Sequence, residues 1–484
     1  MNYKRVGRIL SQILAIEALF MIPALIISII DMDLRVVHAY ILTMLIIIAV
    51  SFLLALLSRN SKRGFYAREG LVCVGLGWLM MSLMGCLPFY ISGQIPHFID
   101  AFFEIVSGFT TTGSTILSDV EALSRGLLYW RSFSHWLGGM GVLVFLLAIA
   151  SSKKNENASS LHILRAESPG PNVGKLVPRM RQTAMILYIL YIVLTVLDFI
   201  FLVAGGMPWF DSLCTAFGTA GTGGFGIKND SMASYSPYLQ TVCTVFMLLF
   251  GVNFNVYYWI IFRQFKNILK NEELRFYILV IVISTGVITW NILSLFNGVG
   301  EALHHAAFQV ASIITTTGFS TVNFDLWPGL SKGIMLTLMI CGACAGSTGG
   351  GMKCSRIVIL LKSIKRSIKR ILHPQQVSTI HCDGQPIPEK VVSGVGDYLI
   401  LYVFIIICSF LIVSIDGFSI ETNISAVISC FNNIGPGFDA VNAFSNFSGY
   451  SVLSKLVLIF DMLAGRLELY PIIILFARRT WRTR

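Results

Sequence analysis

The chain has 484 residues, of which 55% are hydrophobic and only 13% are charged, and its formal net charge is +11. So much apolar surface excludes a soluble globular protein and predicts an all-α polytopic membrane protein. The basic residues gather in alternate loops, as at residues 59–68, 153–181, 263–275 and 362–370. This is the positive-inside pattern, which predicts that both termini are cytoplasmic and that no nucleic acid is bound.

The N-terminal part of the chain, residues 1–68, holds two apolar segments at about 9–30 and 38–57. Each is long enough to cross a bilayer, so together they predict an N-terminal transmembrane helix pair. The remainder repeats one pattern four times: a membrane helix, a short apolar helix, a glycine-bearing stretch and a second membrane helix. We place these repeats at residues 69–182, 183–275, 276–395 and 396–484, with a cytoplasmic loop at the end of the first and of the third. The pattern predicts ten spanning helices around one pore.

The short apolar helices distinguish this pattern from a plain bundle. They lie near residues 99–109, 209–218, 301–313 and 421–432, and each opens near an acidic residue. These acids are Asp100 or Glu104, Asp211, Glu301 and Glu421. About a dozen residues are too few for the roughly 20 that a spanning helix needs, so each segment should enter the membrane and turn back. Irregular backbone at that depth is tolerated only where it is packed in protein or lines a water-filled path.

The return limb of each segment is rich in small residues and carries a glycine. Such residues let the backbone run extended, and a ring of carbonyl oxygens can then replace the water around a dehydrated cation. One such stretch is equally compatible with an ordinary loop or a helix cap, so the prediction depends on the four copies. The predicted filter residues are Thr111, Thr112, Gly113, Gly221, Thr222, Gly223, Thr316, Thr317, Gly318, Asn433, Ile434 and Gly435. Ser107, Ser312 and Ser429 stand six residues before their glycines, whereas Phe217 breaks this series in the second limb.

A glycine-rich run, residues 342–351, interrupts the last helix of the third repeat. Glycine costs up to about 1 kcal/mol relative to alanine inside a helix, so the run should break the helix on the cytoplasmic side of the filter. We interpret it as a gate, and close helix packing is the alternative. The predicted gating residues are Gly346, Gly349, Gly350, Gly351, Lys353 and Arg466. An arginine inside a membrane segment is costly, so Arg466 either pairs with an acid for structure or acts as an electrostatic barrier.

Three other polar residues lie in apolar segments. His135 is either a proton relay or a packing residue, and Asp461 is a second candidate for a coupling group along the path. Asp198 lies towards a helix end, where we expect it to contact water. The basic run from Lys362 to Arg370 has interleaved isoleucines, which is typical of an amphipathic helix that meets membrane lipid or a partner subunit.

The four-repeat order, the filter glycines, the segments RSFSHWLGGMG and GACAGSTGGGMK, and Arg466 together resemble the Trk/Ktr/HKT superfamily of cation transporters. The resemblance covers essentially the whole chain. It implies a potassium filter at the four limbs, an intramembrane gating loop at residues 342–351 and a barrier arginine at Arg466. It also implies a homodimer with one pore per protomer in the bacterial inner membrane, and a cytosolic ring of TrkA-like nucleotide-binding regulatory subunits. Members with serine at the first filter glycine tend toward sodium, so Gly113 favours potassium.

The leading hypothesis is therefore potassium uptake through a gated, carbonyl-lined filter, with K⁺ as the transported ion. The alternative is a symporter that couples potassium to a proton or sodium gradient through His135 or Asp461. An enzyme is not expected, because the sequence has no cluster of His, Asp or Cys suited to metal or acyl chemistry.

Overall fold

The computed structural model describes residues 1–484 except 60–65, 140, 142–179, 377 and 482–484. Helices make up nearly all of the regular structure in this described part, and the only strands there are β1 (His381–Cys382) and β2 (Gln385–Pro386), which form a short hairpin. The predicted N-terminal pair is confirmed. It consists of α1 (Tyr3–Phe20), its continuation α2 (Ile22–Ile30) and α3 (Leu34–Leu57).

Four repeats follow in the predicted order. Their first membrane helices are α4 (Ala67–Gly85) with its extension α5 (Leu87–Ile91), α10 (Met180–Ala204), α15 (Glu272–Ile292) and α19 (Glu389–Val413). Their short pore helices are α6 (Phe98–Phe109), α11 (Trp209–Gly221), α16 (Val299–Ile314) and α20 (Ile420–Asn432). An acid lies in the first turn of each pore helix, at Asp100, Asp211, Glu301 and Glu421. Negative charge suits that end of a helix dipole.

The second membrane helices are not all the continuous spans that we expected: in the described part of the chain, three of the four are broken. They comprise α7 (Arg125–Gly139), α12 (Pro237–Phe250) with α13 (Phe254–Ile261), α17 (Gly329–Cys341) with α18 (Cys354–Leu372), and α21 (Val452–Arg466) with α22 (Tyr470–Phe476). Of the described helices, six are continuous and long enough to span, and α12 with α13 is a pair bent by 90°. Only the break between α17 and α18 was predicted, and the end of the predicted helix at 127–150 lies outside the described residues.

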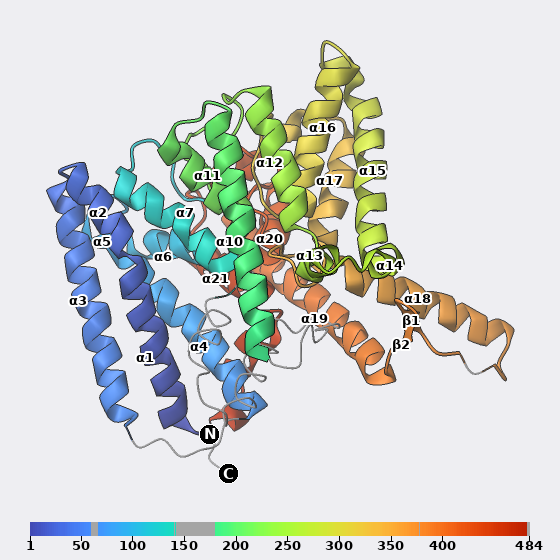
Figure 1. The fold of residues 1–484 in the computed structure, drawn as a ribbon, viewed down its shortest axis with the longest axis horizontal. Helices are drawn as coiled ribbons and strands as arrows, with labels where there is room; N and C mark the ends of the chain where they lie inside the picture. Colours follow the sequence, from blue (N-terminus) through green and yellow to red (C-terminus); the bar gives the residue numbers. More distant parts are fainter. Residues whose placement is uncertain (60–65, 140, 142–179, 377, 482–484) are drawn as a thin grey trace.

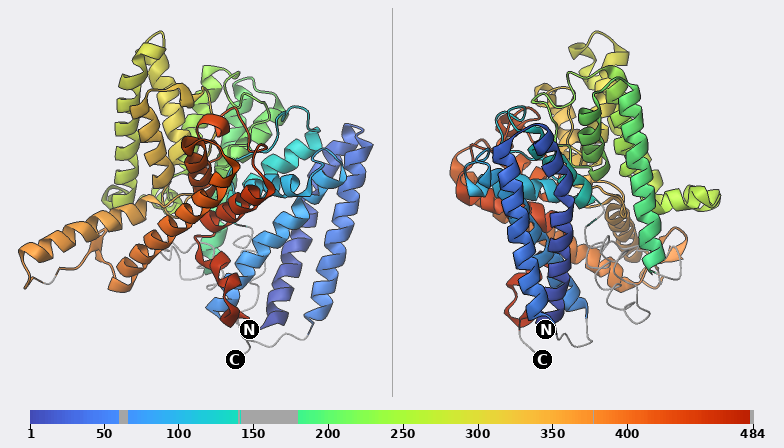
Figure 2. Two further views of the ribbon diagram at one scale, coloured as in Figure 1. Left: turned by 180° about the vertical axis from the view of Figure 1, so that it is seen from behind. Right: turned by 60° about the vertical axis from the view of Figure 1, so that its left-hand side comes forward.

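The repeats close into a ring because each second membrane helix packs on the pore helix of the next repeat. The packed pairs are α7 with α11, α12 with α16, α17 with α20, and α21 with α6. The N-terminal pair stands outside this ring against the first repeat, where α1 contacts α4 and α2 contacts α7. In Figures 1 and 2 it forms one flank of the molecule and α15–α17 form the opposite flank. The helix α18 projects away from the body, as does the short α14 (Phe265–Lys270).

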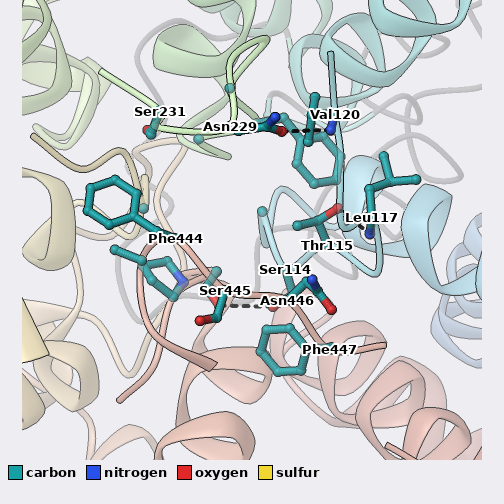
Figure 3. A pocket seen from close by; sticks show the side chains of 18 of the residues that line it. Ser114, Thr115, Leu117, Val120, Asn229, Ser231, Phe444, Ser445, Asn446 and Phe447 are labelled. Atoms are coloured by element: carbon teal, nitrogen blue, oxygen red, sulfur yellow. Dashed lines mark hydrogen bonds between the residues drawn. The ribbon is translucent and has the colours of Figure 1, made fainter. Parts of the chain in front are cut away.

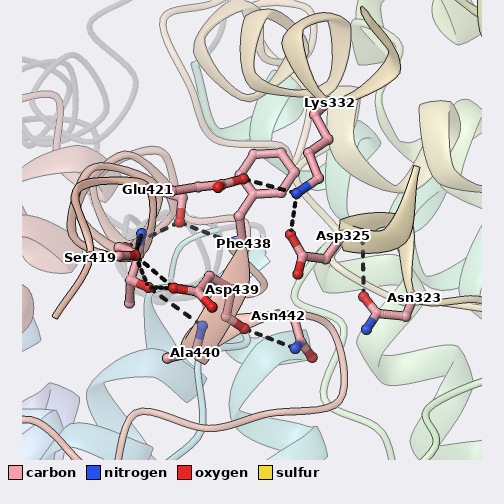
Figure 4. A network of polar contacts seen from close by, with 11 residues as sticks. Asn323, Asp325, Lys332, Ser419, Glu421, Phe438, Asp439, Ala440 and Asn442 are labelled. Carbon is pink, nitrogen blue, oxygen red and sulfur yellow. Dashed lines mark hydrogen bonds and ion pairs between the residues drawn. The ribbon is translucent and has the colours of Figure 1, made fainter. Parts of the chain in front are cut away.

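Two lysines reinforce the ring at the N-terminal ends of the pore helices. Lys332 of α17 pairs with Glu421 of α20 at 3.0 Å and with Asp325 at 2.8 Å, as Figure 4 shows. Lys455 of α21 pairs with Asp100 of α6 at 2.6 Å, so the same link joins the fourth repeat to the first. In the same network, hydrogen bonds from the hydroxyls of Ser419 and Thr422 lower the pKa of Asp439.

Candidate functional site

Every pore helix ends in the same cap. The residue after the helix adopts the left-handed conformation, with φ between 54° and 57° at Thr111, Thr222, Thr316 and Asn433. The next N–H then donates back to a carbonyl five residues earlier, which is the longer bond of the Schellman motif. These bonds join Thr112 to Ser107 (2.9 Å), Gly223 to Gly218 (2.9 Å), Thr317 to Ser312 (2.8 Å) and Ile434 to Ser429 (3.0 Å).

The left-handed residue is usually glycine in this motif, whereas three of the four here are threonine. A β-branched residue there is strained, at a cost of order 1–3 kcal/mol. Such strain persists only where the surroundings fix the backbone, and all four capping residues are fully buried. The limbs are therefore held by the packing around them rather than by local preference.

The cap also fixes the register of the four limbs. The residues two positions after the cap are glycines with positive φ, namely Gly113 (86°), Gly224 (68°), Gly318 (89°) and Gly435 (103°). The in-register glycine of the second limb is therefore Gly224, and the expected alignment on Gly223 is wrong by one residue. Gly223 instead takes the place of Thr112 in the first limb. With this register the residue six positions before the glycine is Gly218 rather than Phe217, so the second limb still lacks the serine that the other three limbs have there.

The four limbs contact one another in a closed ring. A Cβ atom on Gly113 would overlap the carbonyl oxygen of Gly223, and one on Gly224 would overlap that of Thr317. A Cβ on Gly318 would overlap the Ile434 oxygen, and one on Gly435 would lie 2.9 Å from the Thr112 oxygen. Each limb therefore abuts the next with backbone against backbone, and only glycine fits at these points.

Side-chain hydrogen bonds hold the backs of the limbs. Thr110 contacts Thr112 through their hydroxyls at 2.8 Å, and Thr315 contacts Thr317 in the same way at 2.8 Å. In the fourth limb, Asn433 donates to the Thr112 hydroxyl and to the Met462 carbonyl, at 2.9 Å each. These hydrogen bonds restrain the limbs, because moving a limb would leave their buried donors and acceptors without partners.

A buried ion pair anchors the segment that follows the first limb. Arg131 of α7 donates to Glu104 of α6 at 2.6 Å and to the Gly226 carbonyl at 2.8 Å, and its guanidinium lies 3.5 Å from the centre of the Phe225 ring. Glu104 in turn accepts from the Ile116 N–H at 2.9 Å. The pair thus ties the first repeat to the segment after the second limb. The sequence analysis gave Glu104 only as an acid near the start of a short helix. An acid and a base that both lie inside apolar segments could have indicated that Glu104 and Arg131 pair.

We predict that Arg131→Met destabilises the protein strongly. The change leaves the Glu104 carboxylate buried without its cation, which costs roughly 3–5 kcal/mol. Thermal unfolding of the purified protein in detergent measures this as a large fall in Tm. The double variant Glu104→Gln/Arg131→Met should recover much of the loss. The control is Arg125→Met, because Arg125 pairs with Asp31 in a half-exposed position where the expected change is at most about 1 kcal/mol.

A polar pocket lies on the side of the ring that the post-limb segments cover. Its lining includes all four in-register glycines, which are Gly113, Gly224, Gly318 and Gly435. The rest comes from the segments after the limbs, and Figure 3 shows Ser114, Asn229 and Phe444 among the side chains around its open centre. Asn229 accepts from the Val120 N–H at 2.8 Å and so joins the rims of the first two repeats. The ring of limbs is therefore the floor of an open, polar funnel.

The predicted break in the third repeat is confirmed. Residues 342–353 leave the helix between α17 and α18 and lie against the other side of the limbs, where the Gly350 N–H donates to the Thr316 hydroxyl at 2.6 Å. The loop is seated in the break of the second repeat: the Cys344 N–H donates to the Gly251 carbonyl and the Phe254 N–H to the Gly346 carbonyl, at 3.1 Å each. The backbone groups that the two helix breaks leave without helical partners, in the second and third repeats, thus form hydrogen bonds with each other.

Glu273, at the start of α15, binds the backbone both within the loop at residues 342–353 and just after it. Its Oε1 accepts from the Ala345 N–H at 2.6 Å and from the Ser355 N–H at 3.0 Å. Sequence reasoning missed Glu273, because nothing local relates this residue to a loop some seventy positions later.

Arg466 links the loop to two other repeats. Its guanidinium donates to the Thr348 carbonyl at 2.8 Å and, from the end of α21, to the carbonyls of Gly138 and Gly139 in α7. The neighbouring acid Glu468 pairs with Arg356 instead. These contacts make Arg466 a cross-link beneath the limbs. They decide neither of the two expected roles, pairing with an acid or an electrostatic barrier, and both stay predictions. Lys353 donates to the Gly349 carbonyl and closes the loop on itself, with φ of 76°.

The remaining polar candidates are buried. Asp198 is 0% exposed, so the expectation that it contacts water is wrong. His135 and Asp461 are also 0% exposed, and Asp461 accepts a hydrogen bond from Ser409 of α19 at 2.7 Å. No group of three or more metal-ligating side chains occurs among the described residues.

Four re-entrant limbs that meet at the floor of a polar funnel, inside a ring of membrane helices, define a membrane transport protein for ions. The chain belongs to the TrkH family of cation transport proteins, whose model matches residues 37–482, and so to a family of transporters rather than enzymes.

Individual relatives match over nearly their whole length. A protein of Salmonella typhimurium named Trk system potassium uptake protein TrkH is 33% identical over 453 residues, which is 92% of each chain. One of the same name from Halomonas elongata is 32% identical over 490 residues and 100% of both chains. The crystal structure of the potassium transporter TrkH from Vibrio parahaemolyticus matches with a TM-score of 0.88 and 30% identity, covering all of both chains.

Proposed function

We propose that the protein takes up potassium across the bacterial cytoplasmic membrane through the ring of limbs. The names of the relatives from Salmonella typhimurium and Halomonas elongata support potassium as the substrate. The observation that carries the proposal is the closed backbone contact at Gly113, Gly224, Gly318 and Gly435. Carbonyl oxygens held in such a ring can replace the hydration shell of K⁺.

The coordinating backbone is that of the twelve predicted filter residues together with Gly224. Selectivity then depends on how firmly the limbs are held, and the strained caps, the paired threonines and the Arg131–Glu104 pair all act behind the limbs. A stiff ring favours the ion whose size matches it, because a smaller ion cannot draw the oxygens inward without breaking these contacts.

The loop at residues 342–353 is the gate of this path. Its contacts with Thr316, Gly251 and Arg466 hold it beneath the limbs, and opening requires their rupture. The loop continues directly into α18, whose basic residues project from the body. A cytosolic TrkA-like nucleotide-binding subunit acting on this helix can move the loop, since displacement of one end of a rigid helix is transmitted to the other.

The termini are cytoplasmic in this proposal. The support is the placement of basic residues along the sequence, together with the position of the start of α1 and of the C-terminal segment at the end of the molecule opposite the α2–α3 and α15–α16 connections. The protein works as a homodimer with one path per protomer, as the family resemblance implies, and membrane lipid surrounds it.

The alternative is symport coupled to protons or sodium. It needs a titratable or ion-binding group along the path, and His135 and Asp461 are both fully buried. The channel-like mechanism is therefore the one we favour.

Reversal potentials of the purified protein in planar bilayers test the proposal. With opposed gradients of K⁺, Na⁺ and H⁺, the reversal potential should follow the K⁺ gradient alone. A reversal potential that shifts with pH or with Na⁺ at fixed K⁺ would support the symporter instead. Equal currents in K⁺ and Na⁺ would contradict the assignment of the ring as a selectivity filter.

A further inference from the structure

The second limb lacks the side chains that back the first and third. In those limbs two threonines, one and three positions before the in-register glycine, contact each other through their hydroxyls. The corresponding residues of the second limb are Gly223 and Gly221, which offer no side chain at all. Yet this limb abuts the first and third limbs as closely as the others do. Another part of the molecule must therefore back it.

The residue in that place is His135, which comes from α7 of the preceding repeat. A Cβ on Gly223 would overlap the imidazole ring, and a Cβ on Gly221 would overlap the His135 carbonyl oxygen. The ring centre also lies 4.1 Å from that of Phe225, just after the limb. The imidazole thus occupies the volume that threonine side chains fill behind the first and third limbs.

His135 is itself fixed by the first pore helix. Its Nδ1 lies 2.8 Å from the Gly108 carbonyl oxygen, and because a carbonyl only accepts, Nδ1 carries the proton. The same oxygen accepts the Thr111 N–H of the first cap at 3.1 Å. Nε2 is buried and accepts no hydrogen bond among the described residues. The geometry is that of a rigid spacer between two limbs, and within the described ranges it offers no second partner through which a proton could pass.

We propose that His135 is a specificity-determining positioning residue: it sets the position of the second limb relative to the first and thereby tunes discrimination between K⁺ and Na⁺. This inference rests on the proposed function, namely that the four limbs coordinate potassium. It also accounts for Gly223, because a threonine at that position and the imidazole exclude each other. A large side chain at position 135 with glycine at 223, or a small side chain at 135 with threonine at 223, would fill the same space.

The test is a double-mutant cycle on the ratio of K⁺ to Na⁺ permeability, measured from bi-ionic reversal potentials of the full-length protein. His135→Ala removes the spacer, and Gly223→Thr forces a side chain against the ring. Each single change should lower the ratio by about tenfold or more. The double variant His135→Ala/Gly223→Thr should return most of it, because Gly223, unlike Gly224, has no positive φ and the threonine can enter the vacated space.

His135→Asn guards against a variant that fails to fold. Its amide keeps a donor near the place of Nδ1 for the Gly108 carbonyl but lacks the far edge of the ring, so it should fold and still lose part of the selectivity. The inference is overturned if His135→Ala and His135→Asn keep the wild-type ratio, or if the double variant is no better than the worse single variant. A wild-type protein without any preference for K⁺ would instead contradict the proposed function, so the two failures are distinct.

Discussion

Gly113→Ser should abolish most of the preference for potassium over sodium while leaving the protein folded. Two effects act together at this position. The backbone has φ of 86°, which serine adopts only with strain, and its Cβ would overlap the Gly223 carbonyl oxygen of the neighbouring limb. The limbs must separate to relieve the overlap, so the ring widens and loses its match to one ion. We expect the permeability ratio to fall at least about tenfold in bi-ionic recordings.

Gly93→Ser is the matched control for this experiment. Gly93 also has a positive φ, 76°, but no atom lies within 4 Å of the Cβ that serine would add, and the residue is exposed between α5 and α6. Serine at position 93 therefore has the same backbone strain as serine at position 113, but it makes no contact between limbs. If both variants lose selectivity equally, or if Gly113→Ser keeps the wild-type ratio, the assignment of the ring as a filter is wrong.

Arg466→Ala should raise the basal flux of potassium in the absence of any cytosolic partner. The guanidinium bridges the loop at residues 342–353, which is the proposed gate, and the end of α7 through three carbonyl oxygens. Hydrogen bonds from a charged donor contribute roughly 1.5–3 kcal/mol each, so their loss should shift the loop towards its open position by at least about tenfold in population. The removed positive charge also lowers the barrier to a cation. Ion flux into potassium-loaded vesicles of purified protein measures the change.

Two further variants separate these causes. Arg466→Lys keeps the charge, but its single ammonium cannot form the planar fork that reaches both elements, so an intermediate flux is expected. Lys266→Ala removes one charge from the exposed surface of α14 and should leave the flux unchanged. An Arg466→Ala protein that folds, retains selectivity and leaks no faster than the wild type would contradict the gating role of this residue.

Much of the architecture could be predicted from the sequence, because it depends on local patterns. The pore helices follow from apolar segments too short to span, and the observed α6, α16 and α20 begin and end within two residues of the predicted bounds. The break at residues 342–353 follows equally from the low helix propensity of its glycines. These features do not need knowledge of which segments meet in space.

The remaining features could not be predicted from the neighbouring residues in the sequence. Gly223 and Gly224 are adjacent glycines, and only the cap at Thr222 distinguishes them, so the register of the second limb was misjudged. The break at Gly251 lies in a strongly apolar segment, and its backbone is satisfied by Cys344 and Gly346 of the third repeat, which local sequence does not reveal. The anchoring role of Glu273 and the pairing of His135 with Gly223 likewise depend on contacts between repeats.

The first and fourth limbs meet through residues at opposite ends of the chain: the Ser114 hydroxyl donates to the Gly435 carbonyl, 321 positions later, at 3.1 Å. During synthesis, therefore, the closed ring of limbs cannot form until the last repeat has left the ribosome and entered the bilayer. A nascent or prematurely terminated product has three limbs and an open side, and it lacks the Asn433 side chain that holds Thr112 of the first limb.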